Sequence, residues 1–228
     1  RDVGPCTILK VGQNGLLQPS LYRMGGPLRS TPCLVVHRMD HLAPLEARDV
    51  EGLRQAVGRG TPVKFVFFWA HRSPRDGSVS SSCLSQWYAA PFVLDGTLYQ
   101  TAEHYMMARK AEVFGDLEAR RRVMAASKPG AAKAIGREVR GFEESVWARH
   151  RFSIAVTGNL AKFRQNSEVG WYLDNTKRRV LAEASPVDRI WGIGLEASDP
   201  KAYDPAQWEG LNLLGFALME ARTLLTAS

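Results

Sequence analysis

Cysteine is scarce in this sequence, and its scarcity excludes two classes of protein. The three cysteines, Cys6, Cys33 and Cys83, are far apart and form no CxxC pair. A disulfide framework needs an even and denser set, and a zinc ribbon needs closely spaced pairs. We therefore expect an intracellular protein of a reducing compartment.

Other familiar signatures are missing as well. No apolar run approaches the ~18 residues that a membrane-spanning helix needs, so we expect no membrane association. The five histidines show no metal-ligand spacing, and the chain has no HExxH, GxSxG or P-loop motif. Metal-dependent and serine or cysteine hydrolase chemistry is thereby disfavoured, and we expect neither a metal nor a cofactor.

Acidic residues are outnumbered, because 30 Lys and Arg face 23 Asp and Glu over 228 residues, a net charge of +7. The excess is concentrated in residues 120–151. An ion-paired, solvated helical surface and a phosphate-facing patch both explain such a segment, and both remain open. Its nine basic residues are Arg120, Arg121, Arg122, Lys128, Lys133, Arg137, Arg140, Arg149 and Arg151.

The chain divides into two parts by composition. Residues 1–60 are broken by several prolines and by the Gly25–Gly26 pair, with one predicted helix over about 44–57. We treat 1–60 as an N-terminal extension of unknown role and 61–228 as the main domain. Hydrophobic residues make up 45% of the chain, an ordinary globular fraction that allows a real core.

Two single strands and one hairpin are predicted in the main domain. Residues 64–70 (KFVFFWA) are aromatic and β-branched and are typical of a buried strand. Asp95–Gly96 between two apolar runs predicts a hairpin. Residues 179–184 form the third candidate, and the Ser-, Gly- and Pro-rich stretch 72–82 is a predicted loop.

The remaining pattern is helical. Thr101 is a good N-cap and Gly115 a good C-terminal stop for a first helix. Further helices are predicted over 116–126, 130–139, 143–164 and 212–225. The fold class is therefore α+β, a compact and mostly helical domain with a few short strands.

Two pairs of charged residues are candidates for chemistry. Glu103 and Lys110 lie seven residues apart, about two helical turns, and so share a helix face. Glu183 and Asp188 bracket Ser185–Pro186 at the end of a predicted strand, a common location for a site. On spacing alone, each pair is also compatible with exposed side chains that have no role.

Six tryptophans punctuate the chain. Trp87, Trp191 and Trp208 lie next to polar or Gly-rich segments, where an indole can stack on a base or a sugar. Burial in the core is the better interpretation for Trp69 and Trp171, and it is also open for Trp208.

Read together, these pieces resemble the NADAR (YbiA-like) family. The match runs in order over about 65–225. Its segments are Leu84-Ser85-Gln86-Trp87-Tyr88 with Pro91-Phe92, Tyr99-Gln100-Thr101-Ala102-Glu103-His104-Tyr105, Lys110-Ala111 with Phe114-Gly115-Asp116, Trp147, Lys162-Phe163, Leu181-Ala182-Glu183-Ala184-Ser185-Pro186 with Asp188, Trp191-Gly192-Ile193-Gly194, and Trp208-Glu209-Gly210-Asn212-Leu214-Gly215.

The resemblance implies an N-glycosidase with a compact, mostly helical α+β fold. Breaking a ribose–nitrogen bond builds oxocarbenium character that a carboxylate stabilises, while an acid helps the base to depart. Glu103, Lys110 and Asp188 are the implied catalytic residues, and Lys110 can instead attack the anomeric carbon and form a Schiff base. The implied substrate-binding residues are Gln86, Trp87, Arg109, Trp147, Glu183, Trp191, Gly192 and Asn212.

Three hypotheses follow. The first is removal of ADP-ribose from ADP-ribosylated guanine in nucleic acid, with ADP-ribose and nucleic acid as partners. The second is hydrolysis of phosphoribosyl-amine intermediates of riboflavin synthesis. The third is a non-catalytic ADP-ribose or nucleic-acid reader. Gln86–Trp87, where many members have Asn-Phe, and the long loop 72–82 differ from the compact members; no protein partner is indicated.

Overall fold

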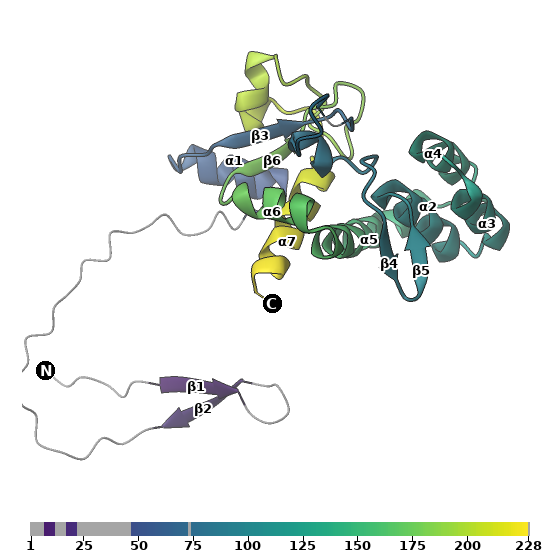
Figure 1. The fold of residues 1–228 in the computed structure, drawn as a ribbon. Coiled ribbons are helices and arrows are strands. Elements are labelled where there is room, and N and C mark those ends of the chain that lie inside the picture. The colour runs from purple at the N-terminus through teal and green to yellow at the C-terminus, as the bar shows by residue number, and fades with distance from the viewer. Residues whose placement is uncertain (1–6, 12–16, 22–46, 73, 228) are drawn as a thin grey trace, which may run out of the picture. The chain divides into compact units, whose positions relative to one another are not determined.

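A computed structural model describes residues 7–11, 17–21, 47–72 and 74–227 (Figure 1). The chain separates into two units, Arg1–His41 and Leu42–Ser228. The first unit contains an antiparallel hairpin of β1 (Thr7–Val11) and β2 (Leu17–Leu21), which the sequence analysis did not predict. Cys6 and Cys33 lie outside the described residues.

The helix α1 (Val50–Gly58) belongs to the second unit. Asp49 caps it by accepting a hydrogen bond from the Gly52 N–H at 2.7 Å, so it begins later than predicted. Leu53 is fully buried, and Arg54 donates to the carbonyl oxygens of Pro205 and Trp208. The folded unit therefore includes part of the segment that we had assigned to the extension.

A two-stranded parallel sheet lies at the centre of one half of this unit. It pairs β3 (Phe65–Phe68) with β6 (Val180–Glu183), as predicted for both segments, in the register Phe65↔Val180. The final helix α7 (Leu213–Thr226) packs against β6 and α5 (Glu144–Gln165) (Figure 1).

The tryptophan predictions are corrected at two positions. Trp69 is 54% exposed and Trp171 is 69% exposed, so neither is a core residue. Trp69 follows the last residue of β3, where the chain has left the sheet, and only Phe68 of that strand is fully covered. Trp208 is buried, and its indole N–H donates to the Ala202 carbonyl at 2.7 Å.

The predicted hairpin and first helix are confirmed. The strands β4 (Phe92–Leu94) and β5 (Thr97–Tyr99) pair antiparallel across Asp95 and Gly96, whose φ angles of 50° and 72° give the expected tight turn. The helix α2 (Ala102–Val113) follows, capped by the Thr101 hydroxyl. Gly115, with φ of 69°, ends it.

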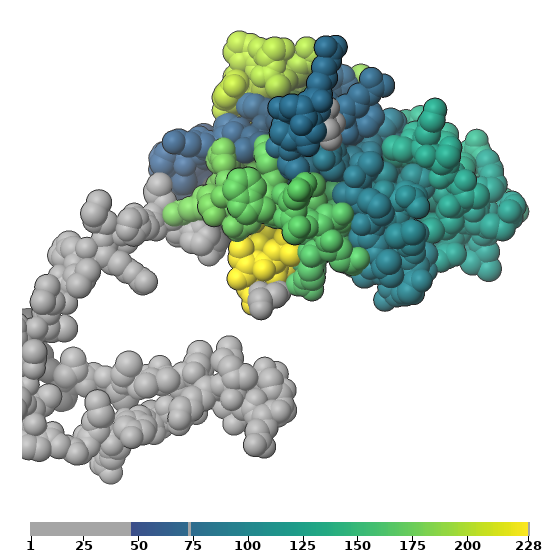
Figure 2. Space-filling view, in the orientation of Figure 1, coloured from purple at the N-terminus to yellow at the C-terminus, as the bar shows by residue number. Residues whose placement is uncertain are grey.

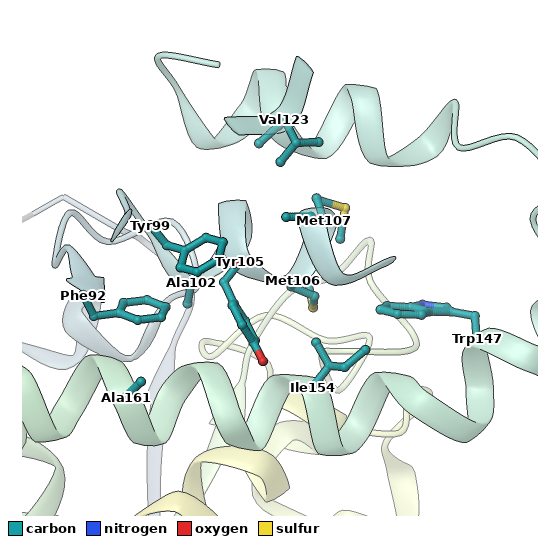
Figure 3. Packing of buried hydrophobic residues seen from close by; sticks show 12 residues of the cluster. Phe92, Tyr99, Ala102, Tyr105, Met106, Met107, Val123, Trp147, Ile154 and Ala161 are labelled. Atoms are coloured by element: carbon teal, nitrogen blue, oxygen red, sulfur yellow. The ribbon is translucent and has the colours of Figure 1, made fainter. Parts of the chain in front are cut away.

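Three further helices surround α2. They are α3 (Leu117–Ala125), α4 (Pro129–Arg137) and the long α5, and each packs directly on α2. Figure 3 shows Tyr105 of α2 reaching onto α5, in the same cluster of buried residues as Met106 and Trp147. Gly158 makes room for it, because a Cβ at this position would lie 2.4 Å from the Tyr105 ring.

One helix was missed, α6 (Ser167–Asn175), which follows α5 after a break at Asn166.

In the space-filling view the α2–α4 half lies to one side of the half built on β3, β6 and α6 (Figure 2). The α+β, mainly helical fold class is confirmed. No described helix has both the length and the apolar character to cross a membrane. Short 3-10 helices complete the second unit: η1 (Ser81–Leu84), η2 (Pro200–Tyr203) and η3 (Pro205–Gln207).

Candidate active site

A cavity of ≈ 750 Å³ lies between the two halves of the second unit. The helices α2, α4 and α5 provide one side of it, and the segments that follow β3 and β6 provide the other. A volume of this size is typical of small-molecule sites. The predicted site residues that line it are Gln86, Trp87, Glu103, Lys110, Trp147, Glu183, Asp188 and Trp191.

Glu103 lies in the first turn of α2 and is only 2% exposed. Its main-chain N–H donates to the Gln86 carbonyl at 3.0 Å, which joins the helix start to the loop before it. Burial raises the pKa of Glu103 to about 7, while Lys133 and a hydrogen bond from the Trp87 side chain oppose that rise. The carboxyl group is thus available as a proton donor near neutral pH.

Glu183 is the last residue of β6 and reaches the same cavity. Burial raises its pKa to about 8, and the neighbouring Asp188 and Glu103 carboxylates add to the rise. Asn212 fixes its backbone, because the amide oxygen accepts from the Glu183 N–H at 3.0 Å and the amide nitrogen donates to Leu181 at 2.9 Å. Two carboxyl groups with raised pKa values therefore share one cavity.

Asp188 is held by the loop that follows β6. One carboxylate oxygen accepts from the main-chain N–H groups of Ile190 and Trp191, at 3.0 and 2.8 Å. The other lies 3.9 Å from the Lys133 ammonium. Two main-chain N–H groups therefore fix the orientation of the Asp188 carboxylate, which faces the Lys133 ammonium. A negative charge that stabilises a positively charged transition state has to be held in place in this way.

Three buried acceptors at the cavity have no hydrogen-bond partner among the described residues: Gln86 Oε1, Glu103 Oε1 and Glu183 Oε2. Buried polar atoms are nearly always paired in native proteins, and unpaired ones indicate a place where water or a ligand binds. Because all three line one cavity, this part of it is the candidate binding site for a group with several polar atoms.

Lys110 lies two turns after Glu103 and lines the same cavity, as the spacing predicted. Its ammonium lies 4.0 Å from the ring centroid of Phe142 and 5.8 Å from that of Trp147. Burial lowers the pKa of Lys110, and the neighbouring Arg137 adds to this while Glu144 opposes it. The aromatic surroundings thus hold an amine that loses its proton more readily than an exposed lysine.

Lys133 of α4 was not predicted as a site residue. It lies across from Asp188, influences the pKa values of Glu103 and Glu183, and stands 6.0 Å from the Trp87 ring centroid. Its only sequence signal was membership of the basic segment. That segment is divided in the structure. Arg120, Arg121, Arg122 and Arg140 form ion pairs away from the cavity, whereas Lys133, Arg137 and Arg151 line it, and Arg151 pairs there with Glu144.

Lys162 is a second lysine that sequence reasoning did not single out as a site residue. It is fully buried, and its ammonium donates to the Cys83 and Ser85 carbonyl oxygens at 2.7 and 2.9 Å. Burial lowers its pKa to about 7. It supports the turn that leads directly into Gln86 and Trp87.

Three predicted binding residues do not line the cavity. Arg109 forms an ion pair with Glu112 and is not among the residues that line the cavity. Gly192 is packed against main chain, where a Cβ would lie 2.8 Å from the Glu183 carbonyl oxygen. Asn212 is fully buried under β6. Gly192 and Asn212 therefore hold the backbone around Glu183 in place and would not touch a ligand in the cavity.

Among the described residues, no group of three or more His, Cys, Asp and Glu side chains is arranged to hold a metal ion.

The family comparison is decisive. A model of the NADAR domain matches residues 67–226. The chain belongs to the NADAR family. The resemblance seen in the sequence is thereby confirmed.

Individual NADAR proteins give the same picture. N-glycosidase R617 of Acanthamoeba polyphaga mimivirus is 40% identical over 164 residues, 70% of this chain and 95% of that protein. N-glycosidase YbiA of Escherichia coli is 30% identical over 62% of this chain and 79% of YbiA. The NMR structure of YbiA superimposes with a TM-score of 0.57 at 27% identity and covers 72% of this chain and 86% of YbiA.

The name of a third relative refers to a biosynthetic pathway. The chloroplastic riboflavin biosynthesis protein PYRR of Zea mays is 33% identical over 132 residues. These residues are 55% of this chain but only 19% of the maize protein. The similarity therefore concerns only one part of a much longer protein.

Proposed function

We propose that this NADAR protein is an N-glycosidase that removes ADP-ribose from ADP-ribosylated guanine in nucleic acid. The observation that carries the proposal is the pair of buried carboxyl groups, Glu103 and Glu183, beside the Asp188 carboxylate in one cavity. Cleavage of a ribose–nitrogen bond needs both functions, a proton donor for the base and a negative charge near the anomeric carbon.

The charges of the cavity suit a phosphorylated ribose. Lys110, Arg137 and Arg151 line it together with the carboxyl groups of Glu103, Glu183 and Asp188. Guanidinium groups bind phosphate oxygens in pairs, so Arg137 and Arg151 are the expected partners of the pyrophosphate. Trp87 and Trp191, which are half-buried and line the cavity, would stack on a base.

The reaction begins with a proton from one carboxyl group of the Glu103–Glu183 pair. It goes to the guanine nitrogen as the bond to the anomeric carbon breaks, and the bonding electrons leave with the base. Asp188 then faces the positive charge that remains on the ribose. In the direct route a water adds to this carbon and gives up its proton to the carboxylate formed in the first step, which yields free ADP-ribose.

In the covalent route the neutral amine of Lys110 takes the place of that water. Its nitrogen bonds to the anomeric carbon and gives one proton to the carboxylate formed in the first step. The second amine proton moves to the ring oxygen as the sugar opens and a C=N bond forms. Addition of one water to this Schiff base releases ADP-ribose and restores the amine.

The test is mass spectrometry of an ADP-ribosylated guanine oligonucleotide incubated with the protein in the presence of borohydride. We expect ADP-ribose release and a reduced adduct on Lys110. The Lys110→Ala variant should form no adduct, whereas Lys177→Ala, which alters an exposed lysine in a surface ion pair, should behave as wild type. Release without an adduct would transfer the chemistry to the direct route, and absence of release would overturn the proposal.

A second candidate function is hydrolysis of phosphoribosyl-amine intermediates of riboflavin synthesis. It is favoured by the similarity to maize PYRR and uses the same carboxyl groups and cations. Turnover of such an intermediate, with no release from the oligonucleotide, would support it. Binding of ADP-ribose without turnover of either substrate would instead indicate a reader.

A further inference from the structure

A second hollow of ≈ 470 Å³ adjoins the cavity. Trp69 and Ala70 line both, so the second hollow begins where the first one ends. Successive residues at the end of β6 face alternate sides of the chain. Glu183 and Ser185 line the cavity, whereas Ala184 between them lines the second hollow. The two therefore lie on opposite sides of the same strand ends.

The second hollow has a flat apolar surface next to polar groups. Trp69 is 54% exposed, an unusual state for a large aromatic residue that packing alone does not require. Arg72 is exposed nearby, and the remaining polar lining comes from Ser80–Ser82, Glu196 and Ser198. Arg72 and the serines belong to the two ends of the long loop 72–82.

These groups fit one class of ligand. An exposed indole stacks on any nucleobase, and a guanidinium binds a backbone phosphate. A carboxylate such as that of Glu196 accepts hydrogen bonds from an exocyclic amino group but repels a phosphate. A base over Trp69 with its phosphate towards Arg72 satisfies all of these, whereas a second free pyrophosphate would face Glu196.

We infer that this second hollow binds the nucleotide next to the modified guanine in a single-stranded nucleic acid. The inference rests on the proposed function and adds to it, because Trp69 would then determine a preference for oligonucleotides over mononucleotides. Single-stranded substrate is required, since a paired neighbour does not offer its ring face to an indole.

The experiment compares release of ADP-ribose from a modified ten-nucleotide DNA strand and from modified guanosine monophosphate. For Trp69→Ala, which borders both hollows, we expect KM to rise roughly tenfold more on the strand than on the mononucleotide. Trp171→Ala is the matched control, because Trp171 is also exposed but lines neither hollow. Arg72→Gln should reduce the salt dependence of KM on the strand alone.

The outcomes separate this inference from the proposed function. An equal change on both substrates, or none on either, would overturn the nucleotide site while release itself supports the glycosidase. If neither substrate is turned over, the proposed function fails and binding decides the site. Anisotropy of a labelled, unmodified ten-nucleotide strand should then weaken several-fold in Trp69→Ala, and equal binding by both proteins would exclude the site.

Discussion

The ammonium of Lys162 lies 2.7 Å from the main-chain oxygen of Cys83, inside the protein and out of contact with solvent. A second bond to Ser85 ties both sides of one turn to α5. The next residues, Gln86 and Trp87, contact Glu103 through a main-chain and a side-chain hydrogen bond. Lys162 therefore acts on the Glu103 carboxyl group only through the turn and through Gln86 and Trp87, and we interpret it as a positioning residue.

Replacing Lys162 with Met, which keeps the length of the stem but removes the donors, should reduce kcat/KM about tenfold and cost about 1–3 kcal/mol of stability. If the turn loosens, Trp87 no longer lowers the pKa of Glu103, so the alkaline limb of the kcat profile should move upwards. Lys177→Met, at an exposed site, should change stability by less than about 0.5 kcal/mol. A destabilised variant with an unaltered pH profile would restrict Lys162 to a structural role.

Glu103→Gln should lower kcat by at least about a hundredfold on whichever substrate the protein turns over, because the amide cannot donate an acidic proton. KM should change little, since the shape of the cavity is kept. Steady-state kinetics against Glu118→Gln, an exposed surface position, isolates the effect. Loss of activity in Glu183→Gln alone would instead identify Glu183 as the proton donor.

The pH dependence of stability should reveal the buried carboxyl groups. Burial raises the pKa of Glu183 from 4.5 to about 8, so the folded protein binds more protons than the unfolded chain between these pH values. Stability must therefore fall as pH rises through this window, and Glu103, with a pKa of about 7, acts in the same direction.

Glu183→Gln removes one of these ionisations. The Tm difference between the variant and wild type should be near zero at pH 5 and should favour the variant by several degrees at pH 9. Scanning calorimetry at both pH values measures it. Glu138→Gln, in an exposed ion pair with Arg122, serves as the control and should show no growth towards high pH. A constant difference for Glu183→Gln would mean that its carboxyl group does not titrate in this window.

Gly158 offers a test of the packing beneath α2. Alanine is the better helix former by about 1 kcal/mol, yet Gly158→Ala should destabilise the protein by roughly 1–3 kcal/mol because its Cβ meets the Tyr105 ring. Gly58→Ala in α1 is matched, since nothing lies within 4 Å of its Cβ, and it should be neutral or slightly stabilising. Denaturant unfolding curves compare the two, and a stabilised Gly158→Ala would refute this account of the packing.

The sequence predicts those parts of the fold that depend on neighbouring residues. Asp95–Gly96 and the Thr101 cap are local, because the turn and the cap use groups within a few positions. The start of α6 after Asn166 escaped prediction, since the Asn166 side chain does not cap that helix and instead donates to the carbonyl oxygens of Pro91 and Lys162. Contacts between distant segments leave no local pattern.

The same reasoning applies to the candidate site. Glu103 and Lys110 were found because they share one helix face, and Glu183 and Asp188 were found because they lie at the end of a predicted strand and in the loop after it. Lys133 could not be found in this way. Its position opposite Asp188 depends on how α4 packs on α2, which a basic run in the sequence does not specify.

The parallel pairing of β3 and β6 has a consequence for how the chain assembles. The paired residues Phe65 and Val180 are separated by about 115 positions, and this interval contains α2 to α6. Closing so long a loop is entropically costly, so the strands should meet after the helices between them have compacted. Because Glu183 ends β6, a folding intermediate would already present Glu103 and Lys110 on α2 but no complete set of carboxyl groups. The site would then become complete only in the last folding step, when β3 and β6, the two strands of this unit that are farthest apart in sequence, pair with each other.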